Sequence, residues 1–297
     1  MSETEFGVTW NNHEARIANQ KMDVLVKQRG LKLNRDKSVC VIIGSKKQKL
    51  EASMELEVKP LKCGEFCTKE KQEEKWLGQY ISGLGLADSV AKTVEAREGK
   101  IKGACMEIAS IVNDWRATVA GGMETALLLW EACCIPSLLH GAGTWVDMSR
   151  ETKRRLNSLQ QWFLRLVLHV GPGAPLPSLY WDFHCLDMGL RVDREKLMLA
   201  LHCRRLGEDS LAGKVYAEQQ AQGWPGLAEE AELICHKLDI ESCDVTLLSK
   251  VQYRKYVTEA CHVKNEERLR EAAEGKQKCE RISRGTMLRR NMYLVPK

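Results

Sequence analysis

The sequence predicts a mainly α-helical protein with a small antiparallel β portion, an α+β fold. Hydrophobic residues make up 44% of the 297 residues and only 7 are Pro, which is an ordered, helix-rich composition. After Gly85, apolar residues recur at helical spacing almost to the end of the chain. Short apolar, strand-like runs lie only before that point. We therefore expect the β portion within the first 85 residues and helices beyond it.

The first 85 residues alternate between helix-like and strand-like patterns. Residues 1–14 are polar and aperiodic, which predicts a flexible start. Apolar residues at helical spacing predict a helix over 15–29, ended by Gly30. Runs at 38–43, 55–58 and 76–82 predict short strands, with a basic turn at 46–49. The Lys- and Glu-rich segment 59–75 is predicted to be a loop.

Three helices are expected next. Asp88 is a candidate N-cap for the first, whose apolar face runs from Val90 to Val112. Gly121 and Gly122 separate it from an apolar helix over 123–140. Glu124, Glu131 and Pro136 interrupt that stretch, so it predicts a buried core helix and not a membrane span. Ser149 is the expected cap of the third helix. Its predicted buried side holds Leu156, Leu159, Trp162, Phe163, Leu166 and Val170.

The segment Gly171–Pro177 is the clearest break in the chain and predicts a subdomain boundary. Shorter helices are expected beyond it, at 193–206, 210–221, 227–238, 245–262 and 266–282. Residues 289–297 should fray.

Charge and cysteine content exclude few partners. The net charge of +5 permits nucleic-acid binding without arguing for it. The N-terminus has no signal-peptide pattern, so we expect an intracellular protein, in cytoplasm or nucleus. None of the 12 cysteines forms a C-x-x-C pair, and the closest spacings are Cys63-x3-Cys67 and Cys133–Cys134. These spacings favour reduced thiols over a structural zinc site.

Two motifs carry a family resemblance. Gly30–Ser38 reads GLKLNRDKS between the predicted helix and strand, and Lys75–Gly78 reads KWLG. In this order they resemble the end of the palm in LINE-type (non-LTR) retrotransposon reverse transcriptases, although the family usually has Tyr or Phe at the position of Trp76. The Gly121–Gly122 turn, the Thr144–Trp145 corner and the segment Trp224–Leu227 resemble the family's thumb and helical extension.

The resemblance implies four segments. Residues 1–14 remain unmatched, 15–85 correspond to the end of the palm with a hairpin like the family's primer grip, 86–173 to a helical thumb, and 174–297 to a helical C-terminal extension. The implied parent activity is RNA-directed DNA synthesis with Mg²⁺. That reaction needs a metal-binding aspartate pair, and the sequence has no Asp-Asp dipeptide. We expect no complete catalytic set, no cofactor held by this chain, and no polymerase activity from the chain alone.

The resemblance also assigns roles to individual residues. Lys37 stands where the family has the lysine that stabilises the charge of the leaving pyrophosphate. The competing interpretation is a solvated lysine in a turn. The box that grips the primer terminus in the family is matched by Lys75, Trp76, Leu77 and Gly78. The competing interpretation is a short strand that packs on the thumb.

Three basic residues, Lys153, Arg154 and Arg155, would follow the phosphates of a duplex from a thumb helix. Acidic runs are interleaved with the basic ones, so plain solvation is the competing interpretation. The expected partner is an RNA–DNA hybrid or another nucleic acid, bound weakly and without sequence preference. The alternatives are a helical protein-interaction scaffold and a decaying relic without activity. Hydrolase and nucleotide-binding motifs such as G-x-S-x-G, H-E-x-x-H and the P-loop are absent.

Overall fold

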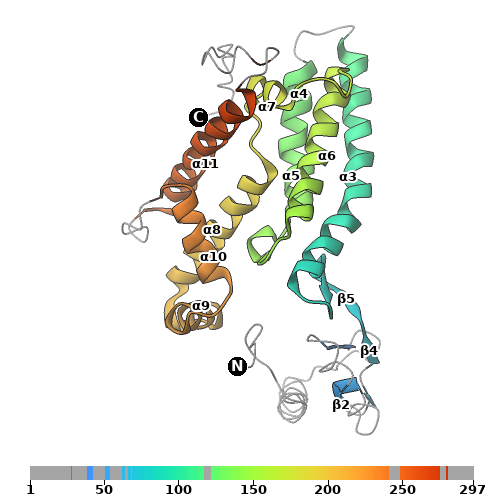
Figure 1. The fold of residues 1–297 in the computed structure, drawn as a ribbon. Coiled ribbons are helices and arrows are strands. Elements are labelled where there is room, and N and C mark those ends of the chain that lie inside the picture. The colour runs from blue at the N-terminus through green and yellow to red at the C-terminus, as the bar shows by residue number, and fades with distance from the viewer. Residues whose placement is uncertain are drawn as a thin grey trace.

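The computed structural model describes residues 28, 39–42, 51–53, 62–63, 66–67, 69–116, 122–240, 248–274 and 279. The fold is mainly α-helical with a small antiparallel β portion, as the sequence predicts (Figure 1). The helix predicted over 15–29 lies outside the described residues except for Gln28, which is helical. The strand predicted at 55–58 also lies outside them.

The β portion consists of three short strand pairs within the described residues. β1 (Val39–Val41) pairs in parallel with β4 (Lys69–Lys71). β2 (Lys62–Cys63) pairs antiparallel with β3 (Phe66–Cys67), and β5 (Glu73–Trp76) with β6 (Gln79–Ser82). The loop predicted over 59–75 was therefore wrong in part. Its Lys and Glu residues suggested a loop, but strands at the edge of a sheet also carry charged side chains.

α3 (Leu86–Arg116) is the longest helix that the structure describes. It begins before Asp88, so the prediction of Asp88 as the N-cap was wrong. Asp88 lies instead in the first turn, where a carboxylate favours the helix dipole, and its Oδ2 lies 3.3 Å from Lys92 Nζ. The predicted apolar face is buried: Val90, Val94, Ile101, Cys105, Ile108 and Val112.

The apolar run after Gly121 forms one continuous helical segment. α4 (Gly122–Leu129) passes into the π-helical turn η2 (Trp130–Cys134) and then into α5 (Ile135–Leu138). Pro136 offers a physical reason for the wider turn, because its ring would clash with the carbonyl of Ala132 in a regular α-helix. Within this turn Trp130 stacks on Phe163 with ring centroids 4.6 Å apart. The segment is a core helix, as predicted.

The 3₁₀ turn η3 (Ala142–Thr144) leads to α6 (Arg150–Leu168). Ser149 caps α6 as predicted, since its side chain accepts a hydrogen bond from the Thr152 N–H at 3.1 Å. Leu156, Leu159 and Phe163 are buried. The prediction for Val170 was wrong: the helix ends at Leu168, and Val170 is exposed beyond it.

The C-terminal part contains α7 (Leu176–Asp182), α8 (Met188–Leu206), the 3₁₀ turn η4 (Gly207–Asp209), α9 (Leu211–Gln222), α10 (Leu227–Lys237) and α11 (Lys250–Ala273). The sequence did not predict α7. α8 begins at Met188 and not at 193, because Asp187 caps it. The helices predicted at 245–262 and 266–282 are wrong as two units, since α11 runs through residues 263–265 without a break.

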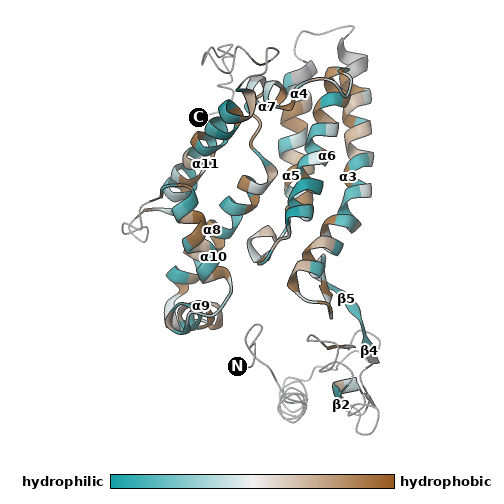
Figure 2. Cartoon of the chain, in the orientation of Figure 1, coloured by the Kyte–Doolittle hydropathy of each residue, from teal (hydrophilic) through white to brown (hydrophobic). Residues whose placement is uncertain are grey.

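Two large hydrophobic clusters meet at α8. The first contains Trp130, Phe163 and Met188, and the second contains Leu190, Tyr216 and Val257. Figure 2 shows the hydrophobic faces of α3, α5 and α6 turned toward one another. None of the helices in the described ranges is long and apolar enough to cross a membrane.

Candidate nucleic-acid interface

The predicted grip residues form the tip of the β5–β6 hairpin. Lys75 is paired with Tyr80 and Trp76 with Gln79, so only Leu77 and Gly78 make the turn. Both turn residues have positive φ, 46° for Leu77 and 82° for Gly78. Positive φ at both central residues is typical of a type I′ turn, whose twist suits two-residue hairpins. The KWLG box therefore forms a tight hairpin tip.

Leu77 is an unfavourable residue for this turn. A non-glycine residue in the left-handed region is strained by contact between its Cβ and the backbone, and glycine, asparagine or aspartate is normally found there. The Leu77 side chain is also 71% exposed, so no burial in the described structure offsets the strain. A strained, exposed side chain at a hairpin tip is the kind of feature that marks binding sites.

Arg97 of α3 fixes the hairpin to the helical part. Its guanidinium donates to the carbonyl of Gly78 at 2.9 Å, and to those of Leu138 and His140 at 2.9 and 2.8 Å. The same group lies 5.7 Å from the ring centroid of Trp145. Burial lowers the pKa of Arg97 from its ordinary value, yet an arginine stays charged at any physiological pH. Three carbonyls from two distant segments thus share one cation.

Gln79 makes a second attachment beside the turn. Its Oε1 accepts from Thr144 Oγ1 and from Trp145 Nε1, each at 3.2 Å. Gly141 faces this side chain at a φ of 71°, and a Cβ there would overlap the amide of Gln79. Further along β6, the Tyr80 N–H donates to Thr93 Oγ1 at 2.8 Å. The hairpin is therefore held from its tip to its base.

Lys75 is the cation of the hairpin itself that lies beside the turn. It is exposed, and its ammonium lies 5.9 Å from the ring centroid of Tyr80. Among the described residues it has no carboxylate partner within ion-pair distance. By contrast, Lys71 pairs with Glu74, and Lys92 pairs with Glu73. Lys75 thus has no counterion among the described residues.

The three basic residues near the start of α6 also differ in whether they have an acidic partner. Arg154 pairs with Glu151 at 3.0 Å, while Arg155 pairs with Glu98 and lies 3.6 Å from Glu95. Lys153, which is partly exposed, has no ion pair within the part of the chain that the structure describes. The predicted basic face therefore has two cations already bound to acids of this chain and one that is not.

The β5–β6 hairpin and the basic residues near the start of α6 contact neighbouring residues of α3. Arg97 holds the hairpin, and its neighbour Glu98 binds Arg155. Burial would raise the pKa of Glu98, but hydrogen bonds from Lys102 and Arg155 lower it, so the carboxylate stays ionised. The structure thereby brings two of the predicted groups to one turn of a rigid helix.

Lys37 lies outside the described residues. Within the described ranges no three His, Cys, Asp or Glu side chains come together in a group that could hold a metal ion.

Arg97, Gln79 and Gly141 were not predicted as site residues. In the sequence, Arg97 is one charged residue among many on a long helix. Its role could not be predicted, because two of its partners are carbonyls about 40 residues away in sequence. Two sequence signals lay beside them: the KWLG box, whose Gly78 binds Arg97, and the Thr144–Trp145 corner, which binds Gln79.

Comparison of the chain with known protein families, with curated proteins and with solved structures gives no match.

Proposed function

We propose that this chain is the C-terminal part of a LINE-type reverse transcriptase, and that it binds nucleic acid duplexes weakly through the β5–β6 hairpin and the start of α6. The parent activity is RNA-directed DNA synthesis. The chain alone has no polymerase activity, because its sequence carries no aspartate pair for the metal ions.

The strongest support is the strained tip of the hairpin. Leu77 is held in the left-handed region, its side chain extends into solvent, and Arg97 fixes the turn from behind. A grip on a sugar–phosphate backbone needs a rigid turn that can approach closely, and Gly78 permits that approach. Lys75 and Lys153 supply two cations without acidic partners among the described residues.

An interaction scaffold is the second candidate, and it has its own supporting observation. Leu211 and Leu233 are 80% and 62% exposed on α9 and α10, far from the hairpin in sequence. Exposed apolar side chains of this size are typical of protein contacts when they cluster. The two candidates are separated by salt dependence, since apolar contacts do not weaken with salt as phosphate contacts do.

The test is fluorescence anisotropy of the purified chain with a labelled RNA–DNA hybrid across a range of salt concentrations. Sequence-independent binding should give a Kd of about 10⁻⁴–10⁻⁶ M. The double substitution Lys75→Gln and Lys153→Gln removes two proposed phosphate contacts. It should reduce the slope of log K against log salt by about 2, close to one for each contact.

A matched control removes two exposed lysines from α9 and α11, with Lys214→Gln and Lys255→Gln. This control has the same net charge as the test variant, and its salt slope should equal that of the wild type. Equal slopes for all three proteins would contradict the proposed interface. Absence of binding at low salt would contradict nucleic-acid binding altogether and favour the scaffold.

A further inference from the structure

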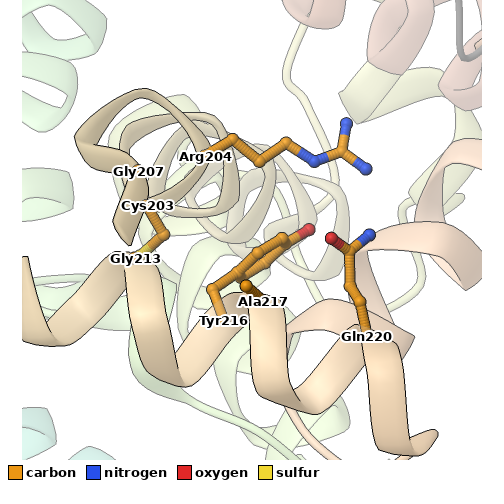
Figure 3. Close-up of a pocket in the computed structure, with 7 residues that line it drawn as sticks. All are labelled: Cys203, Arg204, Gly207, Gly213, Tyr216, Ala217 and Gln220. Atoms are coloured by element: carbon orange, nitrogen blue, oxygen red, sulfur yellow. The ribbon is translucent and has the colours of Figure 1, made fainter. Parts of the chain in front are cut away.

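A cavity of about 340 Å³ lies between the end of α8 and α9, away from the hairpin (Figure 3). Ligand sites for small molecules begin at about 300 Å³, so the cavity is at the lower end of that range. Figure 3 shows the side chains of Arg204, Tyr216 and Gln220 pointing toward one another across its opening. Cys203, Ala217 and two glycines make up the rest of the wall.

Tyr216 contributes an unusual polar group. The residue is 3% exposed, and its hydroxyl makes no hydrogen bond of good geometry within the described structure, although Arg204 lies close enough to lower its pKa. A buried hydroxyl without a partner is unfavourable, and most such groups in folded proteins are satisfied. Burial raises the pKa of this hydroxyl from its ordinary value, so it remains a proton donor at neutral pH.

Arg204 contributes the positive charge. Its guanidinium carbon lies 5.8 Å from the ring centroid of Tyr216, and the side chain is exposed. No carboxylate among the side chains that the structure describes lies within ion-pair distance of it. Its neighbour Arg205 donates to the carbonyl of Leu248. Arg204 is therefore a cation at the cavity mouth without an acidic partner among the described side chains.

Gln220 adds a second neutral donor, and Glu232 lies behind it. Gln220 Nε2 is 3.5 Å from Glu232 Oε1, a long hydrogen bond that an incoming acceptor can replace. The negative charge of Glu232 opposes the binding of an anion. The thiols of Cys203 and Cys235 do not, because burial raises the pKa of both and keeps them neutral.

The shape of the cavity depends on close backbone contact. Gly207, with a φ of 57°, comes next to Gly213 in the first turn of α9, and a Cβ on Gly213 would overlap the Gly207 carbonyl. This packing fixes α9 against the end of α8. The volume is about ten times that of a water molecule in the liquid, which leaves room for more than a single small ion.

We propose that this cavity binds a small organic anion, a compact carboxylate or phosphomonoester, whose charged group is held by Arg204, Tyr216 and Gln220. The polar ends of these three side chains point toward one another (Figure 3), and an oxyanion has enough lone pairs to accept from more than one of them. The body of the ligand lies against Ala217 and the glycine wall. The proposal is independent of nucleic-acid binding by the hairpin.

The test is isothermal titration calorimetry of the full chain with succinate, glycerol 3-phosphate and inorganic phosphate, at constant ionic strength set with sodium chloride. At least one organic anion should bind with saturation. Arg204→Gln should weaken that binding by at least about tenfold, because it removes a charge-assisted hydrogen bond. Lys214→Gln removes an equal charge from α9 outside the cavity and should leave the affinity unchanged.

Two further variants keep the test independent of folding defects. Tyr216→Phe removes only the unpartnered hydroxyl, so thermal unfolding without ligand should occur at the same or a higher temperature, while binding weakens. Glu232→Gln removes the opposing charge and should tighten binding. Failure of all three anions to bind either the wild type or Glu232→Gln would overturn the proposal, as would equal binding by wild type and Arg204→Gln. Inorganic phosphate that binds as tightly as the organic anions would overturn the role of the apolar wall.

Discussion

Leu77 has a positive φ, and the other described non-glycine residues with positive φ are Asp or His, which tolerate that conformation better than leucine does. Leu77→Gly should stabilise the isolated chain, because glycine adopts a φ of 46° without the Cβ contact that strains leucine. The greater entropy of glycine in the unfolded chain offsets part of the gain, so we expect about 0.5–1 kcal/mol. Urea unfolding measures it.

Leu84 provides the control for that substitution. Its side chain is 72% exposed, nearly as much as that of Leu77, but its φ is not positive. Leu84→Gly should therefore destabilise the chain. A destabilised Leu77→Gly would show that the turn is not strained in solution. If Leu77→Gly is more stable yet binds the RNA–DNA hybrid less tightly, the leucine is retained for binding and not for folding.

His262 of α11 should make stability depend on pH. Burial lowers its pKa from the ordinary value of about 6.5, and the positive charge of Arg191 lowers it further. The folded protein therefore takes up a proton on His262 less readily than the unfolded chain. Its effect on stability is absent well above pH 6.5 and becomes a loss as the pH falls below it.

His262→Gln should reduce the loss of unfolding free energy between pH 7 and pH 5. Urea unfolding at several pH values measures this slope. His202→Gln, on an exposed position of α8, is the matched control. A slope that is the same in both variants and in wild type would show that His262 protonates equally in the folded and unfolded states.

At the scale of elements, α8 and α10 are joined by ion pairs with little solvent. The side chain of Lys196 is 4% exposed and pairs with Glu230, and Asp193 pairs with Lys237. Glu230 also accepts a hydrogen bond from the N–H of Asp147, which has a positive φ of 56°. One carboxylate of α10 thereby fixes both α8 and the loop before α6.

Lys196→Met should destabilise the chain by about 2 kcal/mol, because it leaves Glu230 without its cation in a partly buried place. Glu230→Leu should cost more, since it leaves a buried ammonium and an unsatisfied N–H. The double variant should be more stable than the sum of the single effects predicts, and a double-mutant cycle by urea unfolding measures the difference. Additive effects would mean that the two groups do not interact in solution.

Some of these elements could be predicted from local sequence signals alone. Ser149 and the apolar face of α3 were predictable, because a cap and a helical repeat act within a few residues. The pairing of β1 with β4 was not, since it joins segments 30 residues apart in register and β4 is rich in Lys. The start of α3 was predicted too late because Asp88 suits the first turn as well as the cap. Arg97 and Glu230 act over longer distances still, so their roles depended on the three-dimensional structure.

At the scale of the whole molecule, α8 contributes to both hydrophobic clusters. Met188 and Val192 belong to the first cluster, and Leu190 and Leu197 belong to the second. Neither cluster can lose α8 and keep its packing, so unfolding of one should bring about unfolding of the other. We expect one cooperative transition for residues on either side of this helix.

Leu190→Ala tests this coupling. Leu190 is completely buried in the second cluster, and its truncation should lower the free energy of unfolding by about 2–5 kcal/mol. Two buried thiols report the two clusters separately: Cys105 for the first and Cys261 for the second. The reaction of each thiol is measured by mass spectrometry after peptide digestion. In urea both midpoints should fall together, because α8 cannot leave one cluster alone. A Cys105 midpoint equal to that of wild type, beside earlier labelling of Cys261, would mean that the second cluster unfolds by itself.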